Sequence, residues 1–358
     1  MFNKSLTKHD SFTRRLQHWF ARHGRHDLPW QHPRTPYRVW LAEIMLQQTL
    51  VQTVIGYFGR FVQRFPEITD LAVAPADEVM RYWAGLGYYA RARNLHQTAQ
   101  LICTTCSGEF PQDIDRLQQL PGIGRSTAGA ILAQAFGQRH AILDGNVKRV
   151  LARYHGVNGW PGERKVQDRL WQYAERHTPD SQLADYTQAI MDFGATLCTR
   201  VKPRCHDCPM QSGCQAYQHD CVTRLPAPRP RKTLPVKTVC LLVLRDNAGR
   251  ILLEKRPPAG IWGGLWSLPE TAVEVDLPEA CLQRWGFRLA GVKCGTAFRH
   301  TFSHYHLDIT PCHARVKNPG LCVMEDGRWL WYNSAQSPRP ALPAPVAQII
   351  QQLQEETP

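Results

Sequence analysis

Four cysteines in one short segment could bind a metal centre: they are Cys198, Cys205, Cys208 and Cys214, separated by six, two and five residues. Thiolates are ligands of tetrahedral zinc and of iron–sulfur clusters. Zinc ribbons usually contain two close cysteine pairs, whereas this segment has one close pair with a single cysteine on either side. The spacing predicts a metal centre and leaves zinc and a 4Fe-4S cluster open, with Cys221 as a non-ligand.

Two acidic residues, Glu43 and Asp144, are candidates for acid–base catalysis. Glu43 shares a predicted helix face with apolar side chains, where a charge is costly unless it is paired or neutralised. It could be a general acid or a salt-bridged structural residue. Asp144 precedes Gly145 at a predicted helix N-cap, and we expect that position to keep its carboxylate ionised. A helix cap and a catalytic carboxylate are compatible roles.

A tight Gly-x-Gly turn joins two predicted helices in the segment Leu120–Ala128. Gly122 and Gly124 allow backbone N–H groups to point outward at the start of a helix, whose dipole also favours an anion. The pattern is typical of a helix-hairpin-helix that binds a phosphate. Gly-x-Gly alone is common in helical hairpins, and Arg125-Ser-Thr after it strengthens the interpretation.

The charge distribution favours a polyanionic partner. The chain has 358 residues and a net charge of +13, and residues 1–235 hold 30 Lys and Arg against 19 Asp and Glu. Such an excess fits a phosphate backbone, and solubility alone is the other explanation. No apolar run reaches the ~20 residues of a membrane span, and Met1–Arg15 lacks the core of a signal peptide. We therefore expect a soluble, intracellular, cytoplasmic protein, in which the remaining cysteines pack as small hydrophobic residues rather than form disulfides.

The periodicity of apolar residues divides the chain into two domains. Helices are predicted at 11–23, 36–49, 50–64, 75–84, 88–103, 113–119, 125–136, 145–154, 163–177 and 182–196. Strands are predicted at 239–244, 251–255, 296–302 and 306–311, with helices near 278–286 and 344–354. Between them, 225–235 is rich in Pro and basic residues. We predict an all-α domain at 1–224, a linker at 225–235 and an α+β domain at 236–358.

The hairpin, the Asp about 20 residues beyond it and the cysteine spacing together resemble the helix-hairpin-helix DNA glycosylases related to endonuclease III, over about residues 10–220. Within that superfamily the chain resembles the adenine DNA glycosylase (MutY) family in four segments: Trp40–Thr49, Gly85–Asn94, Leu143–Arg149 and Phe298–His306. The resemblance implies a helix-hairpin-helix glycosylase domain whose loop 198–214 holds a 4Fe-4S cluster through the four cysteines. It also implies an enzyme of base excision repair.

The resemblance assigns catalytic roles to Glu43, Asp144 and Asn146. Glu43 would protonate the adenine as the glycosidic bond breaks, Asp144 would stabilise the oxocarbenium-like sugar, and Asn146 would orient the carboxylate. Ser126 stands where lyase-competent relatives carry a Lys that forms a Schiff base, so a monofunctional glycosylase is implied. Gln48 and Tyr88 would fill or wedge the base stack after the base is flipped out, and Thr49 and Leu86 would lie near the partner base. The other expected DNA-contacting residues are Gly122, Gly124, Ser126 and Lys148, with Lys148 expected to bind phosphate. Core packing is the alternative for Leu86 and Tyr88.

The second domain resembles the Nudix (MutT-like) fold, in the segment Gly264–Glu270. Leu282 and Gln283 stand at the places of the metal-binding Glu pair, so divalent-metal hydrolysis is not expected. The family's loop for recognising 8-oxoguanine is matched by Phe302, Ser303 and His304, and an ordinary exposed strand is the alternative. The implied partner is duplex DNA with adenine opposite 8-oxoguanine or guanine, bound by a monomer.

Three other functions stay open. The first is a bifunctional glycosylase and lyase like endonuclease III, acting on oxidised pyrimidines. The second is a lesion sensor that binds DNA without catalysis. The third is a nucleotide pyrophosphatase in the second domain, although the Glu pair is missing.

Overall fold

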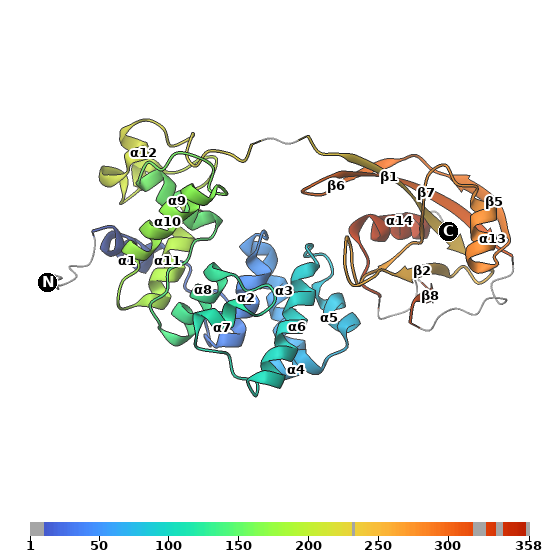
Figure 1. Ribbon diagram of the computed structural model, residues 1–358, viewed down its shortest axis with the longest axis horizontal. Helices are drawn as coiled ribbons and strands as arrows, with labels where there is room; N and C mark the ends of the chain where they lie inside the picture. The colour runs from blue at the N-terminus through green and yellow to red at the C-terminus, as the bar shows by residue number, and fades with distance from the viewer. Residues whose placement is uncertain (1–10, 231–232, 318–326, 334–338, 356–358) are drawn as a thin grey trace. The chain divides into compact units, whose positions relative to one another are not determined.

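The computed structural model describes residues 11–230, 233–317, 327–333 and 339–355 (Figure 1). Two compact units are present: Met1–Val73 with Asn94–Arg231, and Ala74–Arg93 with Lys232–Pro358. The expected linker 225–235 includes residues 231 and 232, which lie outside the described residues. Within the described part, no helix has the length and apolar character that crossing a membrane requires.

The N-terminal part of the chain is helical, as the periodicity predicts. Its elements are α1 (Ser11–His23), α2 (Pro36–Leu46), α3 (Val51–Arg64), α4 (Ile68–Val73), α5 (Ala76–Trp83), α6 (Ala90–Thr105), α7 (Ile114–Gln118), α8 (Arg125–Phe136), α9 (Gly145–Tyr154), α10 (Arg164–His177), α11 (Leu183–Thr196), the short 3₁₀ turns η1 (Cys205–Asp207) and η2 (Gln211–Gly213), and α12 (Gln215–Gln218). The all-α prediction is confirmed. The short helices α4 and α12 have no counterpart among the expected helices, and the helix expected at 36–49 ends at Leu46.

Capping residues set the ends of the helices that carry the site. Thr35 accepts a hydrogen bond from the backbone N–H of Arg38 at 3.3 Å and is followed by Pro36, so α2 begins there. Asp144 caps α9 by accepting from the N–H of Val147 at 2.8 Å. The Gly-x-Gly turn ends at Gly124, the N-cap of α8. The elements with predicted functional residues therefore begin where the sequence indicates.

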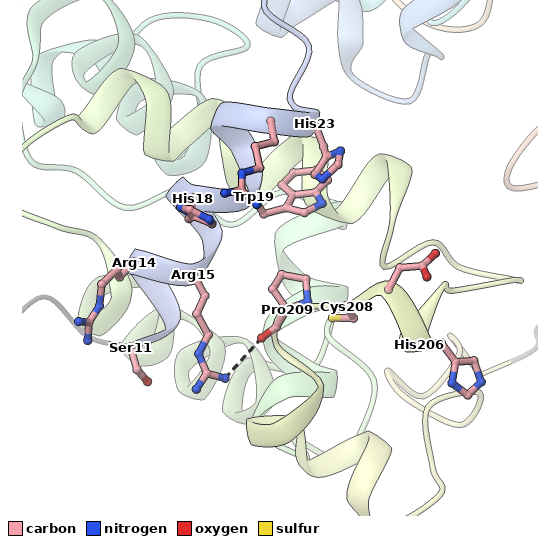
Figure 2. A pocket seen from close by; sticks show the side chains of 11 residues that line it. Ser11, Arg14, Arg15, His18, Trp19, His23, His206, Cys208 and Pro209 are labelled. Carbon is pink, nitrogen blue, oxygen red and sulfur yellow. Dashed lines mark hydrogen bonds between the residues drawn. The ribbon is translucent and has the colours of Figure 1, made fainter.

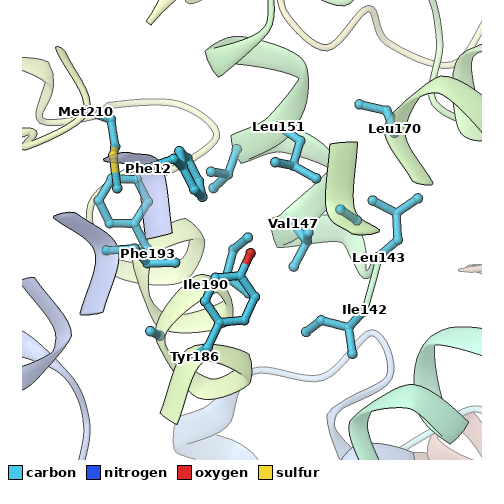
Figure 3. Close-up of a cluster of buried hydrophobic side chains, with 14 of the residues drawn as sticks. Phe12, Ile142, Leu143, Val147, Leu151, Leu170, Tyr186, Ile190, Phe193 and Met210 are labelled. Atoms are coloured by element: carbon cyan, nitrogen blue, oxygen red, sulfur yellow. The ribbon is translucent and has the colours of Figure 1, made fainter. Parts of the chain in front are cut away.

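A hydrophobic core joins α1, α9, α10 and α11 (Figure 3). Phe12 of α1, Val147 of α9, Leu170 of α10 and Phe193 of α11 are all buried in it. Cys198 and Cys208 pack against the same core. This packing fixes the start of α9, and with it Asp144, relative to the cysteine loop.

Besides α5 and the start of α6, which lie in Ala74–Arg93, the second unit contains a mixed sheet with two helices from Val236 onward. Its elements are β1 (Val236–Arg245), β2 (Ile251–Lys255), β3 (Trp266–Ser267), β4 (Glu270–Thr271), α13 (Leu277–Trp285), β5 (Leu289–Cys294), β6 (Phe298–Thr301), β7 (His306–Val316), β8 (Trp329–Tyr332) and α14 (Ala344–Glu355). The strand order is β3-β2-β1-β7-β5, with β4 on β1, β6 on β7 and β8 on β2, and only β1 and β7 pair in parallel. The predicted α+β class is confirmed, although β3, β4, β5 and β8 were not expected.

One expectation about the cysteines is wrong. Cys294 of β5 and Cys312 of β7 form a disulfide, although the sequence suggested that cysteines outside the loop would pack as small hydrophobic residues. The two strands run antiparallel with Cys294 directly opposite Cys312, so the register brings the sulfurs together. The expectation holds for Cys240 and Cys281, which are buried free thiols.

Candidate active site

A cavity of about 430 Å³ in the helical unit collects most of the predicted catalytic and DNA-contacting residues. Its lining includes Glu43, Gln48, Thr49, Ser126, Asp144 and Asn146. The residues come from α2 and the turn after it, from α8, and from the start of α9, while α11 contributes Gln188, Met191 and Ala195. Segments far apart in the sequence thus meet in one pocket.

Glu43 faces this pocket without a cationic partner. The side-chain amide of Gln134, on α8, donates to its Oε1 at 3.2 Å, and no Lys, Arg or His forms an ion pair with it among the described residues. Glu43 keeps some exposure to the pocket, yet loss of hydration together with the charge of Asp144 raises its pKa to about 7. The salt-bridged alternative is therefore wrong, and the carboxyl can hold a proton near neutral pH.

Asp144 lies at the N-terminus of α9 in the same pocket. Its carboxylate accepts from the N–H of Val147 at 2.8 Å and from the side-chain amide of Asn146 at 3.4 Å. Burial raises its pKa, while hydrogen bonds from the backbone N–H groups of Val147 and Asn146 and the charges of Arg149 and Lys148 lower it. The pKa of Asp144 is raised overall. The sequence led us to expect that the N-cap position would keep the carboxylate ionised, and that position alone does not determine its charge. Lost hydration outweighs the cap, and the positive charges of Arg149 and Lys148 limit the rise.

Arg149 connects the pocket to the cysteine loop. Its Nη2 donates to Oδ1 of Asn146 at 2.8 Å and to the carbonyl of Gly194 at 2.7 Å, and its Nε donates to the carbonyl of Cys198 at 2.8 Å. Asn146 is thus held from one side by Arg149 and contacts Asp144 on the other. This supports the orienting role predicted for Asn146, and it assigns Arg149 a positioning role that the sequence interpretation missed.

Ser126 lines the pocket in the first turn of α8. Its hydroxyl accepts a hydrogen bond from the N–H of Leu143 at 2.9 Å, next to Asp144 in the chain. The side chain thereby ties α8 to the segment that carries Asp144. It has no amine that could attack a sugar.

The other predicted DNA contacts are spread over the molecule. Gln48 is exposed at the pocket with a positive φ of 58°, and Gly122 has a φ of 79° in the hairpin turn, where added bulk would meet Asn94 at 3.0 Å. Lys148 lies on α9 but does not line the pocket. Leu86 and Tyr88 belong to the other unit. Leu86 is buried, as its packing alternative predicts, whereas Tyr88 is 51% exposed with a positive φ, so core packing is excluded for Tyr88.

The four cysteines of the loop line one common cavity, together with Arg153 and without Cys221. Nη1 of Arg153 donates to Sγ of Cys198 at 3.4 Å. Burial and neighbouring thiols raise the pKa of Cys208 to about 12 and also raise that of Cys205 and Cys214. Among the described residues, no three or more His, Cys, Asp or Glu surround a point that a single metal ion could occupy.

Phe302, Ser303 and His304 form the turn of the hairpin between β6 and β7 in the second unit. The N–H of Phe302 donates to the carbonyl of Tyr305 at 2.9 Å, which closes the turn. The ring of Phe302 lies 5.5 Å from that of Trp262 and 4.8 Å from that of Tyr305. Ser303 and His304 are exposed, so the turn offers hydroxyl and imidazole groups on an aromatic support.

Several residues that shape the pocket were missed by the sequence interpretation. Gln134 is the one polar residue between Ala128 and Phe136 of α8, and that pattern is the signal that could have found it. Arg25 lines the pocket, and its N–H donates to the fully buried Asp192 at 2.8 Å while its guanidinium forms an ion pair with the same carboxylate. Their sequence separation of 167 residues left no local signal.

Comparison with known proteins identifies the class to which this fold and pocket belong. Residues 41–176 match the HhH-GPD superfamily of base excision DNA repair proteins, and residues 239–352 match the NUDIX domain. A solved thermostable thymine-DNA glycosylase covers 58% of this chain and 95% of its own, with a TM-score of 0.54 and 29% identity. An endonuclease III–DNA complex, at 23% identity and a TM-score of 0.51, shares the fold over 58% of the chain.

Within this class the chain belongs to the adenine DNA glycosylase family. It is 35% identical over 344 residues to the adenine DNA glycosylase of Buchnera aphidicola subsp. Baizongia pistaciae, covering 96% of this chain and 97% of that one. It is 34% identical to the adenine DNA glycosylase of Homo sapiens, covering 89% of this chain and 70% of the human one. The chain is thus a DNA glycosylase with the helix-hairpin-helix domain and the Nudix domain of this family.

Proposed function

We propose that this enzyme hydrolyses the N-glycosidic bond of adenine in duplex DNA when the adenine stands opposite 8-oxoguanine or guanine. The observation that carries the proposal is the pairing of Glu43 and Asp144 in one pocket, where burial raises the pKa of Glu43 to about 7. Two carboxyl groups with different surroundings supply the acid and the carboxylate that cleavage of a glycosidic bond requires. The names of the family members supply adenine as the base.

The proposed mechanism divides the work between the two carboxyl groups. Protonated Glu43 gives its proton to the adenine as the bond to the sugar lengthens, and Gln134 holds the carboxyl through Oε1. The carboxylate of Asp144 stabilises the positive charge that develops on the sugar. Asn146 and Arg149 keep that carboxylate in place, as their hydrogen bonds indicate. Glu43, now ionised, can accept a proton from the water that completes hydrolysis.

We propose base removal without strand cleavage, because Ser126 occupies the first turn of α8 and already accepts the N–H of Leu143. A serine hydroxyl cannot form a Schiff base with the sugar. The bifunctional alternative would need another amine, and Lys148 does not line the pocket. We assign Lys148 and the Gly122–Gly124 turn to phosphate binding, and Gln48 and Thr49 to contacts around the flipped base.

We also propose that the four cysteines hold a 4Fe-4S cluster. They line one cavity, and four Cys thiolates are the ligand set of such a cluster. When bound, the cluster would supply a cross-link of the loop. Iron and zinc analysis of the purified protein tests this, and zinc without iron would contradict it.

For the second domain (236–358), we propose that Phe302, Ser303 and His304 recognise 8-oxoguanine opposite the adenine. The hydroxyl and imidazole of the exposed turn can pair with the polar edge of a base, and the ring of Phe302 can pack on its face. We expect a monomer to bind one mispair.

The decisive experiment is a glycosylase assay on duplexes that contain adenine opposite 8-oxoguanine, guanine or thymine. We expect abasic sites opposite the first two bases, revealed as strand breaks only after alkali, and a rate that falls as the pH rises above about 7 because Glu43 loses its proton. Absence of adenine release would refute the proposal. Breaks before alkali, with an adduct trapped by borohydride, would favour the bifunctional alternative.

A further inference from the structure

A basic groove lies between α1 and the cysteine loop (Figure 2). Its volume is about 690 Å³, and it shares no residue with the catalytic pocket. The guanidinium and imidazole groups in its lining come from Arg14, Arg15, His18, Arg22, His23 and His206. Asp207 is the single acidic residue that lines it. The groove therefore carries a net positive charge that the proposed chemistry does not use.

Two contacts hold the walls of the groove in place. Nη1 of Arg15 reaches across and donates to Oγ of Ser212 at 2.8 Å and to the carbonyl of Pro209 at 3.4 Å. Trp19 is buried, with its ring 5.0 Å from that of Phe193 on α11. Arg14 and Arg22 are exposed and form no ion pair among the described residues. The groove is thus preformed, and these two charges are available to a ligand.

The groove lies on the far side of α11 from the catalytic pocket. Met191 and Ala195 of α11 line the pocket, whereas Phe193 contacts Trp19 of α1. At about 100° per residue, Phe193 points roughly opposite to the direction midway between Met191 and Ala195. A duplex whose base occupies the catalytic pocket therefore meets the opposite face of this helix.

We propose that this groove docks an acidic peptide segment of a partner protein. The wall formed by the 13 residues of α1 is about 20 Å long, which matches about six residues of extended chain. Carboxylates form strong, bidentate hydrogen bonds with guanidinium groups. A single-stranded nucleic acid would also need exposed aromatic rings on which its bases could stack. The lining contains one Trp, Tyr or Phe residue, Trp19, and its side chain is only 6% exposed. The proposal is independent of which base the enzyme removes.

The test measures fluorescence polarisation of a labelled octapeptide of alternating Asp and Ser with the full-length, cluster-loaded protein. We expect saturable binding that Arg14→Glu with Arg22→Glu weakens at least about tenfold. The control, Arg164→Glu with Lys165→Glu on the exposed start of α10, makes the same charge change outside the groove and should weaken binding less than about threefold, because salt screens distant charges.

Further measurements keep the outcomes distinct. Arg14→Gln with Arg22→Gln should give an intermediate loss, and thermal melts establish that each variant is folded. Glycosylase rates on the duplex should be the same in groove variants and parent. The proposal is overturned if the parent does not bind the peptide or if both charge-reversed variants lose the same affinity. It is also overturned if a labelled eight-nucleotide oligothymidylate binds more tightly than the peptide, or if the groove variants lose glycosylase activity in parallel with peptide binding.

Discussion

The catalytic pocket and the turn between β6 and β7 use opposite physical surroundings. In the pocket, Glu43 and Asp144 lose hydration, and side chains from α8 and α9 hold them. In the turn, Ser303 and His304 are exposed, and aromatic packing, one backbone hydrogen bond and a contact between their own side chains support them. Proton transfer requires a shifted pKa, which burial provides before substrate binds. Reading a base requires groups that remain free to form new hydrogen bonds.

The largest effect is expected from the pocket. Glu43→Gln should lower the single-turnover rate of adenine release by about 10³-fold or more, because the amide cannot supply the proton. Asp144→Asn should lower it by a similar factor, since the charge facing the sugar is lost. Quenched-flow or gel-based single-turnover assays on duplex with adenine opposite 8-oxoguanine measure both rates.

These two substitutions carry their own structural controls. Asn is as good an N-cap as Asp, so α9 should keep its start in Asp144→Asn. In Glu43→Gln, the carbonyl oxygen of the introduced amide can still accept the hydrogen bond from Gln134. Unchanged duplex affinity with full activity in either variant would show that the pocket is not the reactive centre. Burial of the two carboxyl groups would then no longer distinguish a catalytic site from the exposed turn.

The second effect concerns the cost of burying Glu43. Its folded-state pKa of about 7 lies above the ordinary value of 4.5, so the protein loses stability as the pH rises from about 4.5 to about 7 and stays lower above that. Glu43→Gln removes this penalty. Its free energy of unfolding should exceed that of the parent by about 2–3 kcal/mol at pH 8.5 and much less at pH 5. Denaturant melts at the two pH values measure the difference.

The exposed Glu109 supplies the matched control for that experiment. Glu109→Gln changes the same chemical group outside the pocket, and it should show no such dependence on pH. If Glu43→Gln were equally stabilising at both pH values, burial would not be what perturbs the carboxyl. Loss of hydration would then not explain how the carboxyl groups of the pocket differ from the exposed groups of the turn.

Much of this arrangement was predictable because local patterns encode it. The N-caps Thr35 and Asp144, and the glycines at 122 and 124, begin or join helices through backbone chemistry that a few neighbouring residues determine. The residue types of Glu43 and the four cysteines indicate their chemistry in the same local way. Helices and candidate side chains could therefore be predicted without coordinates.

What escaped prediction depends on contacts between distant segments. Gln134 reaches Glu43 only because α8 packs beside α2, and Arg25 meets Asp192 across 167 residues. The disulfide between Cys294 and Cys312 follows from the register of β5 on β7, and a strand was not expected at β5. The raised pKa of Asp144 required knowing how much water the fold removes, which the cap position could not indicate.

The third effect is expected in the turn, and it should appear in selectivity. Phe302→Ala and His304→Ala should each reduce the preference for adenine opposite 8-oxoguanine over adenine opposite guanine by about tenfold, because one exposed contact contributes about 1–2 kcal/mol. Competitive assays with both duplexes in one tube give the ratio directly. Loss of activity on both duplexes by the same factor would instead assign the turn a general role in binding.

The smallest effect concerns the ion pair beside that turn. Arg299 on β6 donates through Nε and Nη2 to Asp308 on β7, at 2.7 and 2.8 Å, and the two residues face each other across the strands in an exposed position. Water competes for both groups, so Arg299→Met should leave the melting temperature and the selectivity ratio unchanged within error. Differential scanning fluorimetry and the competitive assay measure these quantities. A clear drop in melting temperature would mean that the turn, like the pocket, depends on a fixed electrostatic interaction. The two regions would then differ in the exposure of their functional side chains but not in the kind of contact that positions them.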